Sequence, residues 1–458
     1  MLKASWGGGG KGIRMVKSVD EVPNAFKQVQ AEVPGSPIFA MKLATNSRHL
    51  EVQLLADMHG NVCSIFSRDC SVQRRHQKIV EEGPVTVANP ETLEHMEKCA
   101  RSLARSVKYV GAATVEYLYA MEEDGYCFLE LNPRLQVEHP VTEWISGVNI
   151  PACQVLIAQG VPLHAIPDLR RLYGKDPEGT GPIDFEDSQA RVPAAGHVIA
   201  VRITAENAND GFKPTAGRIE EISFKNNPDV WGYFSVKGGG SVHEFSDSQF
   251  GHLFAKAETR NAAIRAMVVA LKELKIRGEI RTNSDYVCEL IQTEDFVGDV
   301  HNTGWLDKRI ADQKTTEKPP WHLSVVCGAA VRSMQRFNEK QVEYLGYLEK
   351  GQLPPARISM NSTVESIVVD DEKFTVEVQR TGPQNLSLRL NGTSVDVVVR
   401  ELNDGGLLIQ LDGTSHVVHS EEEPSGTRLL IGTSTCMLSS EKDPSQLKCL
   451  TSGKLIRY

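Results

Sequence analysis

The sequence predicts an α+β protein with mixed or antiparallel sheets, and three observations favour that class. Two strand-like segments, Ala112 to Leu118 and Tyr126 to Leu131, flank a polar turn and predict a β-hairpin. Apolar residues recur with a helical period from Asn89 to Val107 and from Thr259 to Lys275, which predicts two amphipathic helices. Strict alternation from Phe374 onward predicts antiparallel β-structure near the carboxyl end.

Composition limits the classes of protein that need to be considered. The 458 residues suggest roughly two to four domains. A net charge of −9, without a broad basic stripe, argues against a nucleic-acid partner. No apolar run approaches the roughly 20 residues that a membrane span requires. The nine cysteines lack paired spacing, so we expect a reducing compartment rather than a disulfide framework or a zinc site.

The amino end carries groups that suit a nucleotide phosphate. Lysines at Lys3 and Lys11 flank a run of four glycines, Gly7 to Gly10. Glycines allow backbone N–H groups to turn toward an anion, and lysines add positive charge. The spacing does not match a Walker loop or a dinucleotide fingerprint, so a flexible tether is the alternative.

A basic segment follows between Arg68 and Pro84, and a helix comes after it. The segment is read as a solvated basic loop, and nucleic-acid binding is a poor alternative because the net charge of the chain is −9. Asn89 and Pro90 then form a helix start signal, an asparagine cap with proline in the first turn. The apolar stripe of this helix is interpreted as core.

The predicted hairpin places two carboxylates close together. With its turn centred near Glu123, the pairing sets Glu116 across from Glu130, with Cβ atoms roughly 5 Å apart. Two carboxylates at that distance repel, so a partner must neutralise them. Either a divalent cation such as Mg²⁺ or a salt bridge to Arg134 or a lysine would do so.

Five polar residues alternate with apolar ones from Glu130 to Glu138, ahead of His139 and Pro140. If this segment is extended, two acids, one guanidinium and two amides lie along one edge. We interpret the row as a site for a charged ligand.

The remaining chain is read in the same way. The stretch from Asp176 to Val192 is rich in Gly, Pro and Asp and predicts an exposed loop. The helix that begins at Thr259 is expected to end near Gly278. We place a domain boundary at Lys314 to Pro320, followed by a helix near Val331 to Lys350. Asn391-Gly392 and Asp412-Gly413 predict hairpin turns, and His416 and His419 are read as sheet residues.

Several of these segments together resemble the biotin carboxylase component of biotin-dependent carboxylases, which is an ATP-grasp enzyme. The matching segments are Lys3 to Gly12, Arg48 to Gln53, Arg68 to Lys78 and Glu130 to Pro140. Further segments resemble the large multidomain acetyl-CoA carboxylases of eukaryotes, in particular those of the plant type: Asn209 to Pro214, Trp231 to Val236, Phe245 to His252, Gly304 to Asp307, Gly346 to Gln352 and Asp404 to Leu408.

The resemblance implies a domain organisation. Residues 1–84 correspond to the ATP-grasp lid and the start of the catalytic body, and residues 85–313 to the rest of that body with its carboxyl-terminal subdomain. Residues 314–458 correspond to a helix set against an antiparallel, barrel-like sheet that docks domains onto one another. In the family, a further α/β domain precedes the lid, and a biotin carrier and a carboxyltransferase follow. The chain is therefore expected to be a fragment.

The resemblance also implies a reaction. Bicarbonate is activated with ATP to give carboxyphosphate, whose CO₂ passes to biotin; in the whole enzyme, acetyl-CoA then becomes malonyl-CoA for fatty acid biosynthesis. Glu138 occupies the position of the general base, Arg134 that of the group stabilising charge on biotin, and Arg202 that of a basic residue facing carboxyphosphate and biotin. Lys78, Gln136 and the backbone of Val137 match bicarbonate-binding positions.

Cofactor positions follow from the same resemblance. The nucleotide-binding positions are Lys3, Gly8, Gly9, Lys42, His49, Gln73 and His76. The metal positions, for two Mg²⁺ or Mn²⁺ ions, are Glu116, Glu130 and Asn132. Met41-Lys42-Leu43 resembles a biotin-acceptor motif, but Lys42 follows a strand within the ATP-grasp match, so biotin is expected from a carrier domain outside this chain.

Partners and alternatives complete the expectations. The expected partners are the biotin carrier domain, the carboxyltransferase and a second copy in a homodimeric parent, with neither nucleic acid nor membrane. The cytoplasm is the expected location, with the plastid as the alternative. Two other readings stay open: an inactive docking or regulatory fragment, and the same half-reaction in another acyl-CoA carboxylase.

Overall fold

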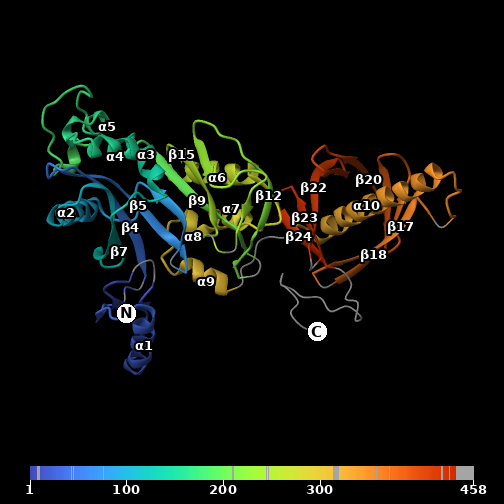
Figure 1. The fold of residues 1–458 in the computed structure, drawn as a ribbon, viewed down its shortest axis with the longest axis horizontal. Helices are drawn as coiled ribbons and strands as arrows, with labels where there is room; N and C mark the ends of the chain where they lie inside the picture. Colours follow the sequence, from blue (N-terminus) through green and yellow to red (C-terminus); the bar gives the residue numbers. More distant parts are fainter. Residues whose placement is uncertain are drawn as a thin grey trace. The chain divides into compact units, whose positions relative to one another are not determined.

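The structure is a computed structural model. It describes residues 1–7, 11–42, 44, 46–75, 77–208, 211–243, 245, 247–312, 319–356, 358–370, 372–423, 426–432 and 434–439. The chain divides into two compact units, Met1–Thr315 and Thr316–Tyr458 (Figure 1).

The first unit begins with a small layer of its own. Strands β1 (Leu2–Ala4), β2 (Ile13–Arg14) and β3 (Ile38–Ala40) form an antiparallel sheet in the order β2-β1-β3. A 3-10 turn (Val19–Glu21) leads into helix α1 (Val22–Glu32), which packs on this sheet through Ala25 and Val29. The sequence reading missed α1, because its buried stripe is only these two small residues.

An eight-stranded sheet is the centre of the first unit, with the order β13-β15-β9-β6-β5-β4-β7-β8 and antiparallel pairing throughout. Its strands are β4 (Ser47–Ala56), β5 (Val62–Arg74), β6 (Gln77–Gly83), β7 (Gly111–Ala120), β8 (Gly125–Asn132), β9 (His197–Thr204), β13 (Val230–Phe234) and β15 (Gln249–Ala257). Strands that precede residue 84 and strands that follow it lie in the same sheet. The predicted boundary at residue 84 therefore separates functional regions in the family resemblance and does not divide this sheet.

Both faces of the sheet are covered. The ten side chains of β4 are all buried: Leu50 and Val52 pack toward helix α2 (Pro90–Ser106), while Glu51 and Gln53 point to the other face. Helix α6 (Arg260–Glu273) covers β9 and β15 on the same face as α2, through Val201 and Leu253, and α3 packs on the opposite face through Val141 and Ile145. The other helices of the unit are α3 (His139–Ser146), α4 (Ile150–Ala158), α5 (Pro167–Leu172), α7 (Ser284–Leu290), α8 (Glu294–Val297) and α9 (Trp305–Ala311), with 3-10 turns at Leu163–Ala165 and Ser188–Ala190.

Short strands complete the first unit. Strands β10 (Glu206–Asn207) and β11 (Lys213–Pro214) pair with each other, and a second small sheet has the order β14-β12-β16, from β14 (Ser241–Val242), β12 (Gly217–Ser223) and β16 (Lys275–Gly278).

The predicted helices of this unit are confirmed, with corrections at their ends. The Asn89 side chain does not cap α2; its amide donates to Asp124 instead, over 2.7 Å. Thr259 does cap α6, by accepting from the N–H of Ala262. α6 ends at Glu273, close to the expected Lys275, but Gly278 is not its stop signal, because the backbone is already extended at Leu274 and β16 begins at Lys275. The segment from Asp176 to Val192 forms the predicted loop apart from one 3-10 turn.

The second unit consists of one long helix and a closed antiparallel barrel. Helix α10 (Trp321–Glu349) begins ten residues before the predicted Val331, directly after Pro320. The barrel runs through β17 (Ser362–Val369), β18 (Glu372–Arg380), β19 (Asn385–Leu390), β20 (Thr393–Glu401), β21 (Leu407–Leu411), β22 (Thr414–Glu423), β23 (Gly426–Ile431) and β24 (Ser434–Ser439).

The part of α10 from Ser324 to Phe337 packs on the barrel. Val325, Cys327 and Phe337 are buried in the same cluster as inward-facing strand residues. Gly328 lies so close to Leu438 that a Cβ at this position would come within 2.4 Å of its side chain. The predicted turns at Asn391-Gly392 and Asp412-Gly413 join β19 to β20 and β21 to β22. The expected helix plus barrel-like sheet is confirmed.

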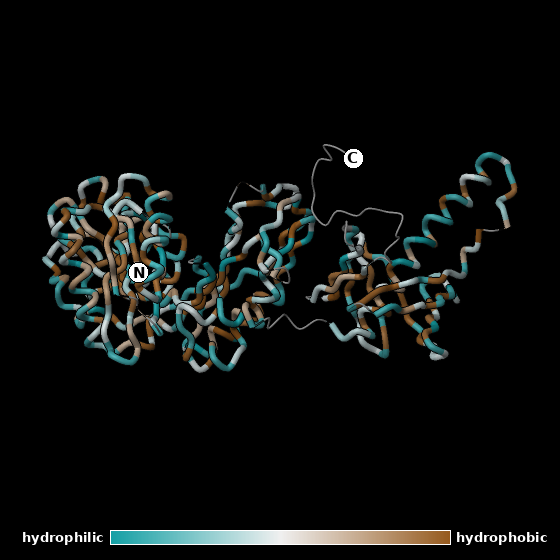
Figure 2. Tube along the Cα trace, turned by 90° about the horizontal axis from the view of Figure 1, so that it is seen from below, coloured by the Kyte–Doolittle hydropathy of each residue, from teal (hydrophilic) through white to brown (hydrophobic). Residues whose placement is uncertain are grey.

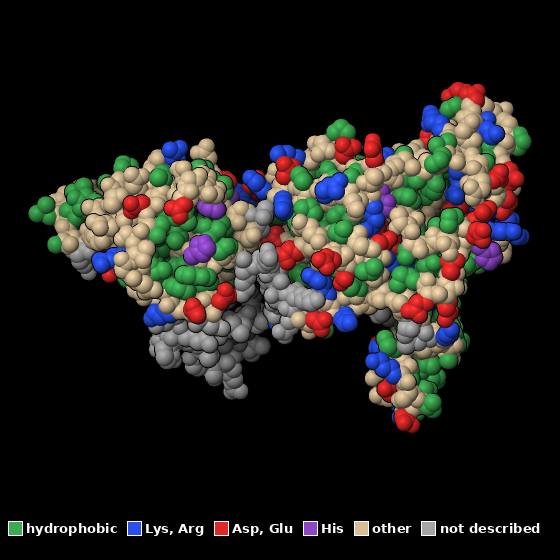
Figure 3. All heavy atoms as spheres, turned by 180° about the vertical axis from the view of Figure 1, so that it is seen from behind, with side chains coloured by type: hydrophobic (Ala, Val, Ile, Leu, Met, Phe, Trp, Pro, Cys, Tyr) green, Lys and Arg blue, Asp and Glu red, His purple; other side chains and the backbone are tan. Residues whose placement is uncertain are grey.

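The surface is mixed in character. Hydrophobic segments alternate with polar ones along the strands of both units (Figure 2). On the face that Figure 3 shows, acidic and basic side chains are interspersed, with hydrophobic side chains between them. Among the described residues, none of the helices has the length and apolar composition of a membrane span.

Candidate active site

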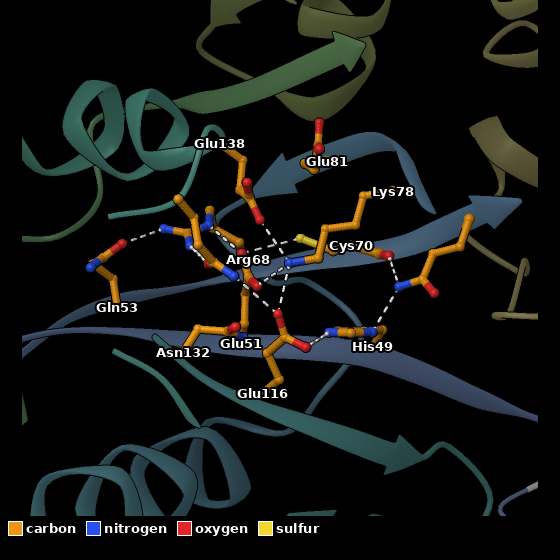
Figure 4. A network of polar contacts seen from close by, with 12 residues as sticks. His49, Glu51, Gln53, Arg68, Cys70, Lys78, Glu81, Glu116, Asn132 and Glu138 are labelled. Carbon is orange, nitrogen blue, oxygen red and sulfur yellow. Dashed lines mark hydrogen bonds and ion pairs between the residues drawn. The ribbon is translucent and has the colours of Figure 1, made fainter. Parts of the chain in front are cut away.

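Polar side chains from neighbouring strands converge on one face of the eight-stranded sheet (Figure 4). This is the face on which α3 packs, through Val141 and Ile145 against Val198 and Ala200. The contributing residues are His49, Glu51 and Gln53 of β4, Arg68 and Cys70 of β5, Lys78 and Glu81 of β6, Glu116 of β7, Glu130 and Asn132 of β8, Arg202 of β9, and Gln136 and Glu138 before α3.

Lys78 lies at the centre of this cluster. Its Nζ donates to Glu51 Oε2 at 2.6 Å, to Glu138 Oε1 at 2.7 Å and to Glu116 Oε1 at 3.0 Å. Burial removes hydration and lowers the pKa of this amine, but the three carboxylates and the nearby Cys70 outweigh burial and hold the pKa well above its usual value. The ammonium therefore stays charged, with all three hydrogens engaged.

An irregularity in strand pairing explains why Lys78 can reach the cluster. Lys78 and Glu81 are three residues apart on β6, so regular alternation would point them to opposite faces. The register between β5 and β6 shifts between the pair Val72 and Val80 and the pair Gln73 and Lys78, which adds one residue to β6. Such a bulge redirects a side chain, and here it brings Lys78 to the same side as Glu81.

A second cation supports the cluster from within the sheet. Arg68 is completely buried; its Nε donates to Glu51 Oε1 at 2.6 Å and its Nη2 to Gln136 Oε1 at 3.1 Å. Another of its nitrogens donates to Gln53 at 2.9 Å and to Thr142 at 2.7 Å. Glu51 thereby holds Arg68 with one oxygen and Lys78 with the other, which fixes the relative position of the two cations.

Glu138 lies between two cations. Its Oε1 accepts from Lys78, and its Oε2 accepts from Arg202 Nη2 at 3.2 Å. Burial alone would raise the pKa of this carboxyl, but Lys78, Arg202 and Arg68 hold it well below the usual range. Arg202 in turn donates from Nε to Glu81 at 2.5 Å. Glu138 is thus ionised, which is the state that a general base needs.

His49 is fixed by an amide and a carboxylate. Gln73 donates from Nε2 to His49 Nδ1 at 2.7 Å, which leaves the proton of the neutral ring on Nε2. That nitrogen lies 3.0 Å from Glu116 Oε2. Burial acts to raise the pKa of Glu116, but His49 and Lys78 lower it below the usual range.

The predicted hairpin and its register are confirmed. β7 and β8 pair with Glu116 opposite Glu130, and residues 121–124 form the connecting turn. Lys78 and His49 contact Glu116, so this carboxylate has the salt bridge to a lysine that the sequence predicts as an alternative to a bound cation. Glu130 is half-buried and accepts from the amide of Asn132 at 3.3 Å.

The expectation of one extended edge from Glu130 to Glu138 is wrong beyond Asn132. β8 ends there, Pro133 has no N–H for the ladder, and the N–H of Arg134 donates to the carbonyl of Asn132 in a turn. Gln136 and Glu138 nevertheless return to the cluster and are buried. Arg134 is exposed, and its guanidinium contacts the carbonyl of its neighbour Leu135.

The other predicted residues are placed as follows. Lys3 lies on β1, and its Nζ donates to the carbonyl of Leu129 on β8 at 3.3 Å. Lys42 is exposed just after β3, and Val137 is half-buried between Gln136 and Glu138. Gly8, Gly9 and His76 lie outside the described residues.

Five buried residues of the cluster had no role in the sequence reading: Glu51, Gln53, Arg68, Cys70 and Glu81. The Cys70 thiol donates to Glu51 Oε1 at 3.3 Å, and burial, with Glu51 nearby, raises its pKa well above the usual value. A signal was available, because His49, Glu51 and Gln53 alternate with apolar residues on a strand that is otherwise core.

Three protein families match successive parts of the chain. Carbamoyl-phosphate synthase L chain, ATP binding domain, matches residues 1–166. Biotin carboxylase C-terminal domain matches residues 200–308, and acetyl-CoA carboxylase, BT domain, matches residues 321–439.

Relatives of high identity cover the whole chain. It is 55% identical over 469 residues to acetyl-CoA carboxylase 1 of Oryza sativa subsp. japonica, 56% identical over 469 residues to acetyl-CoA carboxylase 1 of Arabidopsis thaliana, and 50% identical over 465 residues to acetyl-CoA carboxylase of Dictyostelium discoideum. In each case the match covers 100% of this chain but only 20–21% of the relative. The chain thus spans about one fifth of the length of these relatives.

Solved structures agree with the sequence matches. The biotin carboxylase-beta-gamma-ATP complex from Campylobacter jejuni is 34% identical, with a TM-score of 0.59 over 67% of this chain and 64% of its own. The biotin carboxylase domain dimer of Hydrogenobacter thermophilus 2-oxoglutarate carboxylase, with MgADP, ADP and bicarbonate, is 30% identical, with a TM-score of 0.59 over 69% of this chain and 65% of its own. Residues 1–166 and 200–308 therefore match the domains of biotin carboxylases, and over its whole length the chain is similar to one region of eukaryotic acetyl-CoA carboxylases.

Proposed function

We propose that this chain carries out the biotin carboxylase half-reaction, in which ATP and bicarbonate form carboxyphosphate and its CO₂ passes to biotin. The observation that carries the proposal is the sharing of Lys78 among Glu51, Glu116 and Glu138, with Arg202 on the second oxygen of Glu138. This arrangement provides two buried cations on either side of one carboxylate, which suits a reaction that deprotonates a small anion.

Lys78 and Arg202 would hold the anion. Bicarbonate brings a negative charge that competes with Glu138 for both cations, and the amide of Gln136 and the backbone of Val137 lie next to them. Lys78 suits this exchange because an ammonium is a compact charge whose donors can take new partners, whereas a guanidinium prefers fixed, planar pairing.

The low pKa of Glu138 is consistent with a role as base. In the structure the carboxylate is held by Lys78 and Arg202, so it is ionised but a weak proton acceptor. When bicarbonate draws on those two cations, the carboxylate loses part of their stabilisation and its proton affinity rises. The site would thereby provide a stronger base only when its substrate is present.

The residues on and beside β8, the edge strand of the eight-stranded sheet (the open edge), are of types that bind a nucleotide and a metal ion. Glu116, Glu130 and Asn132 offer oxygen ligands, which Mg²⁺ and Mn²⁺ prefer, and Glu116 would give up contacts with Lys78 and His49 to take part. Metal bound there would neutralise phosphate charge. His49 and Gln73 would lie on the nucleotide side, with Lys3 and Lys42 as phosphate partners.

Arg134 is proposed to act on biotin. Its guanidinium is exposed at the end of β8, where a biotin group delivered by a carrier domain could reach it. A planar, permanently charged group is suited to stabilise the negative charge that forms on the ureido ring when its nitrogen loses a proton.

The parent enzyme and its partners belong to the same proposal. Because the relatives that match over the whole chain are acetyl-CoA carboxylases, the chain would work with a biotin carrier and a carboxyltransferase that forms malonyl-CoA. A homodimer is the proposed assembly, supported by the dimer named for the Hydrogenobacter thermophilus domain.

The test is bicarbonate-dependent ATP hydrolysis with Mg²⁺ and free biotin. Glu138→Gln should lower the rate about 10²–10⁴-fold, the range typical of a lost general base. Glu123→Gln, the same substitution at an exposed position of the β7–β8 turn, should leave the rate unchanged. A well-folded chain without bicarbonate-dependent hydrolysis would contradict activity of this chain alone and favour a docking or regulatory role.

A further inference from the structure

A thiol, an imidazole and a phenol meet on the face of the eight-stranded sheet opposite Lys78. His95 and Cys99 lie one turn apart on α2, and Tyr126 reaches them from β8. The Tyr126 hydroxyl lies 2.7 Å from His95 Nδ1 and 3.2 Å from Cys99 Sγ. Cys99 Sγ lies 3.9 Å from His95 Nε2, which closes the triangle.

Each of the three side chains lies within hydrogen-bonding distance of the other two. Burial and the contact with Cys99 raise the pKa of Tyr126, so the phenol keeps its proton and donates to Sγ. In one tautomer of neutral His95, Nδ1–H donates to the Tyr126 oxygen and Nε2 accepts from the thiol. Transfer of the thiol proton to Nε2 leaves a thiolate that receives hydrogen bonds from both the phenol and the imidazolium.

We propose that Cys99 is a site of covalent thiol modification, at which its thiolate attacks a low-molecular-weight disulfide. The thiol proton passes to His95 Nε2, a new S–S bond forms between Cys99 Sγ and one sulfur of the disulfide, and the old S–S bond breaks. The leaving thiolate takes up the proton from His95 or from water. The protein gains a mixed disulfide and the reagent is reduced to one thiol.

The contrast with the other cysteines supports this choice. Among the eight cysteines in the described part of the chain, six are buried, Cys99 is half-buried and Cys127 is exposed. Accessibility alone would make Cys127 the first to react. Thiolate stabilisation by neighbouring donors favours Cys99, because the thiolate is the nucleophile. Cys99 on α2 and Cys127 on β8 thus provide an internal comparison within one protein.

This site goes beyond the proposed carboxylase function, which uses none of the three residues. An adduct on Cys99 would stand between α2 and the start of β8, because Tyr126 is the second residue of that strand. The Tyr126 ring also packs edge-on against Tyr117, with centroids 5.1 Å apart, so the modified thiol lies at a packed helix–sheet contact.

The experiment treats the full chain with glutathione disulfide and follows both cysteines by peptide mass spectrometry. Cys99 should form the mixed disulfide at least about tenfold faster than Cys127. His95→Gln should lower the Cys99 rate about tenfold and leave the Cys127 rate unchanged, since His95 is exposed and contributes little to the core. Tyr126→Phe should lower it by a smaller factor.

Two results would overturn the proposal. The first is a Cys127 rate equal to or above that of Cys99, which would show that exposure alone decides. The second is an unchanged Cys99 rate in His95→Gln, which would remove the role of the imidazole. The Cys127 rate, measured in the same samples, shows whether a variant has disturbed the hairpin, and Cys99→Ser identifies the modified peptide.

Discussion

Two buried ionic networks lie on opposite faces of the same sheet. Adjacent residues of β4 and β5 contribute side chains to both networks. His49 and Arg68 point to the face of Lys78, and their neighbours Arg48 and Asp69 point to the other face. On that second face, Arg48 contacts Asp69 at 3.1 Å and Asp299 at 2.6 Å. The two networks use similar residue types, so their differences show what a reactive site needs.

The difference is the cation at the centre. On the second face, the Arg260 guanidinium contacts both oxygens of Glu82, at 2.6 and 3.1 Å, and Arg48 divides its nitrogens between two acids. Such paired geometry ties β5 and β6 to residues 299–301 and leaves little freedom for exchange. The Lys78 network instead has one ammonium shared by three carboxylates, a set of contacts that a competing anion can redistribute.

Replacing Lys78 should have the largest effect. Lys78→Met leaves three carboxylates without their shared cation, so bicarbonate-dependent ATP hydrolysis should fall about 10²–10⁴-fold. The free energy of unfolding should fall by about 3–5 kcal/mol, because unpaired buried charges remain. Both are measured on the purified chain, by coupled ATPase assay and urea unfolding.

The comparison depends on separating these two losses. Adding Glu138→Gln to Lys78→Met should restore part of the stability, since one unpaired charge is removed, but none of the activity. Lys98→Met, at an exposed position of α2, is the matched control and should change neither quantity appreciably. Recovered activity in the double variant would contradict an active role for Lys78.

Replacing Arg48 should separate stability from activity. Arg48→Met removes the cation from Asp69 and leaves Asp299 only the more distant Arg260, at 3.9 Å, so the free energy of unfolding should fall by about 3–5 kcal/mol. The folded fraction, determined by circular dichroism, should keep most of its ATP hydrolysis. Arg171→Met, which breaks the exposed pair with Asp168, should cost no more than about 1 kcal/mol. A specific activity that falls with Arg48→Met as far as with Lys78→Met would erase the distinction between the networks.

The second network also predicts two opposing pH dependences. Burial raises the pKa of Asp69 to about 6, with Arg48 opposing and Glu82 adding to the shift. Burial and Arg48 lower the pKa of His301 to about 4, with the nearby acids Glu82 and Asp299 opposing. The raised pKa contributes stability at low pH that is lost as pH rises through 6. The lowered pKa contributes stability above about pH 6.5 that is lost as pH falls through 4.

Single variants should reveal these opposite slopes. Each slope is compared with that of the unsubstituted chain, because Glu82, Glu116 and Glu138, whose pKa values are lowered, also add stability as pH rises from 4. His301→Gln removes a contribution that grows with pH, so between pH 4 and 6.5 its free energy of unfolding should fall behind that of the unsubstituted chain by up to about 3 kcal/mol. Asp69→Asn removes a contribution that shrinks with pH, so its free energy of unfolding should gain on that of the unsubstituted chain over the same interval. Urea unfolding at four pH values measures the slopes, and deviations of equal sign in the two variants would refute the assignment.

Local patterns predicted part of this architecture well. Alternation of polar and apolar residues predicted the β7–β8 hairpin and its Glu116–Glu130 register, and the helical period of apolar residues predicted α2 and α6. Both patterns depend only on residues that are close together in the sequence. The position of Lys78 could not be predicted in that way, because it depends on a bulge between β5 and β6. Helix α1 was not predicted, because its buried face consists of Ala25 and Val29 only and gives almost no helical period of apolar residues.

Other features exceeded local reasoning for different reasons. The row from Glu130 to Glu138 has strand periodicity, but Pro133 ends the ladder and the chain turns, so period alone gave the wrong shape. The role of Glu51 was hidden because Arg68 and Lys78 reach it from other strands. The boundary at Lys314 to Pro320 came from composition, whereas the barrel came from family resemblance, since alternation predicts strands but not the closure of a sheet.

Glu130 should give the smallest effect and the sharpest test of the open edge. It faces Glu116 across the hairpin, yet its described contact is an amide rather than a cation. If it holds metal, Glu130→Gln should raise the Mg²⁺ concentration for half-maximal ATP hydrolysis about tenfold, equivalent to about 1.4 kcal/mol. Stability should stay unchanged, because no buried pair is broken; Glu123→Gln, at the turn of the same hairpin, should alter neither. An unchanged Mg²⁺ requirement in Glu130→Gln would show that this carboxylate does not bind the metal. The contacts that a ligand redistributes would then be limited to those between Lys78 and its three carboxylate partners.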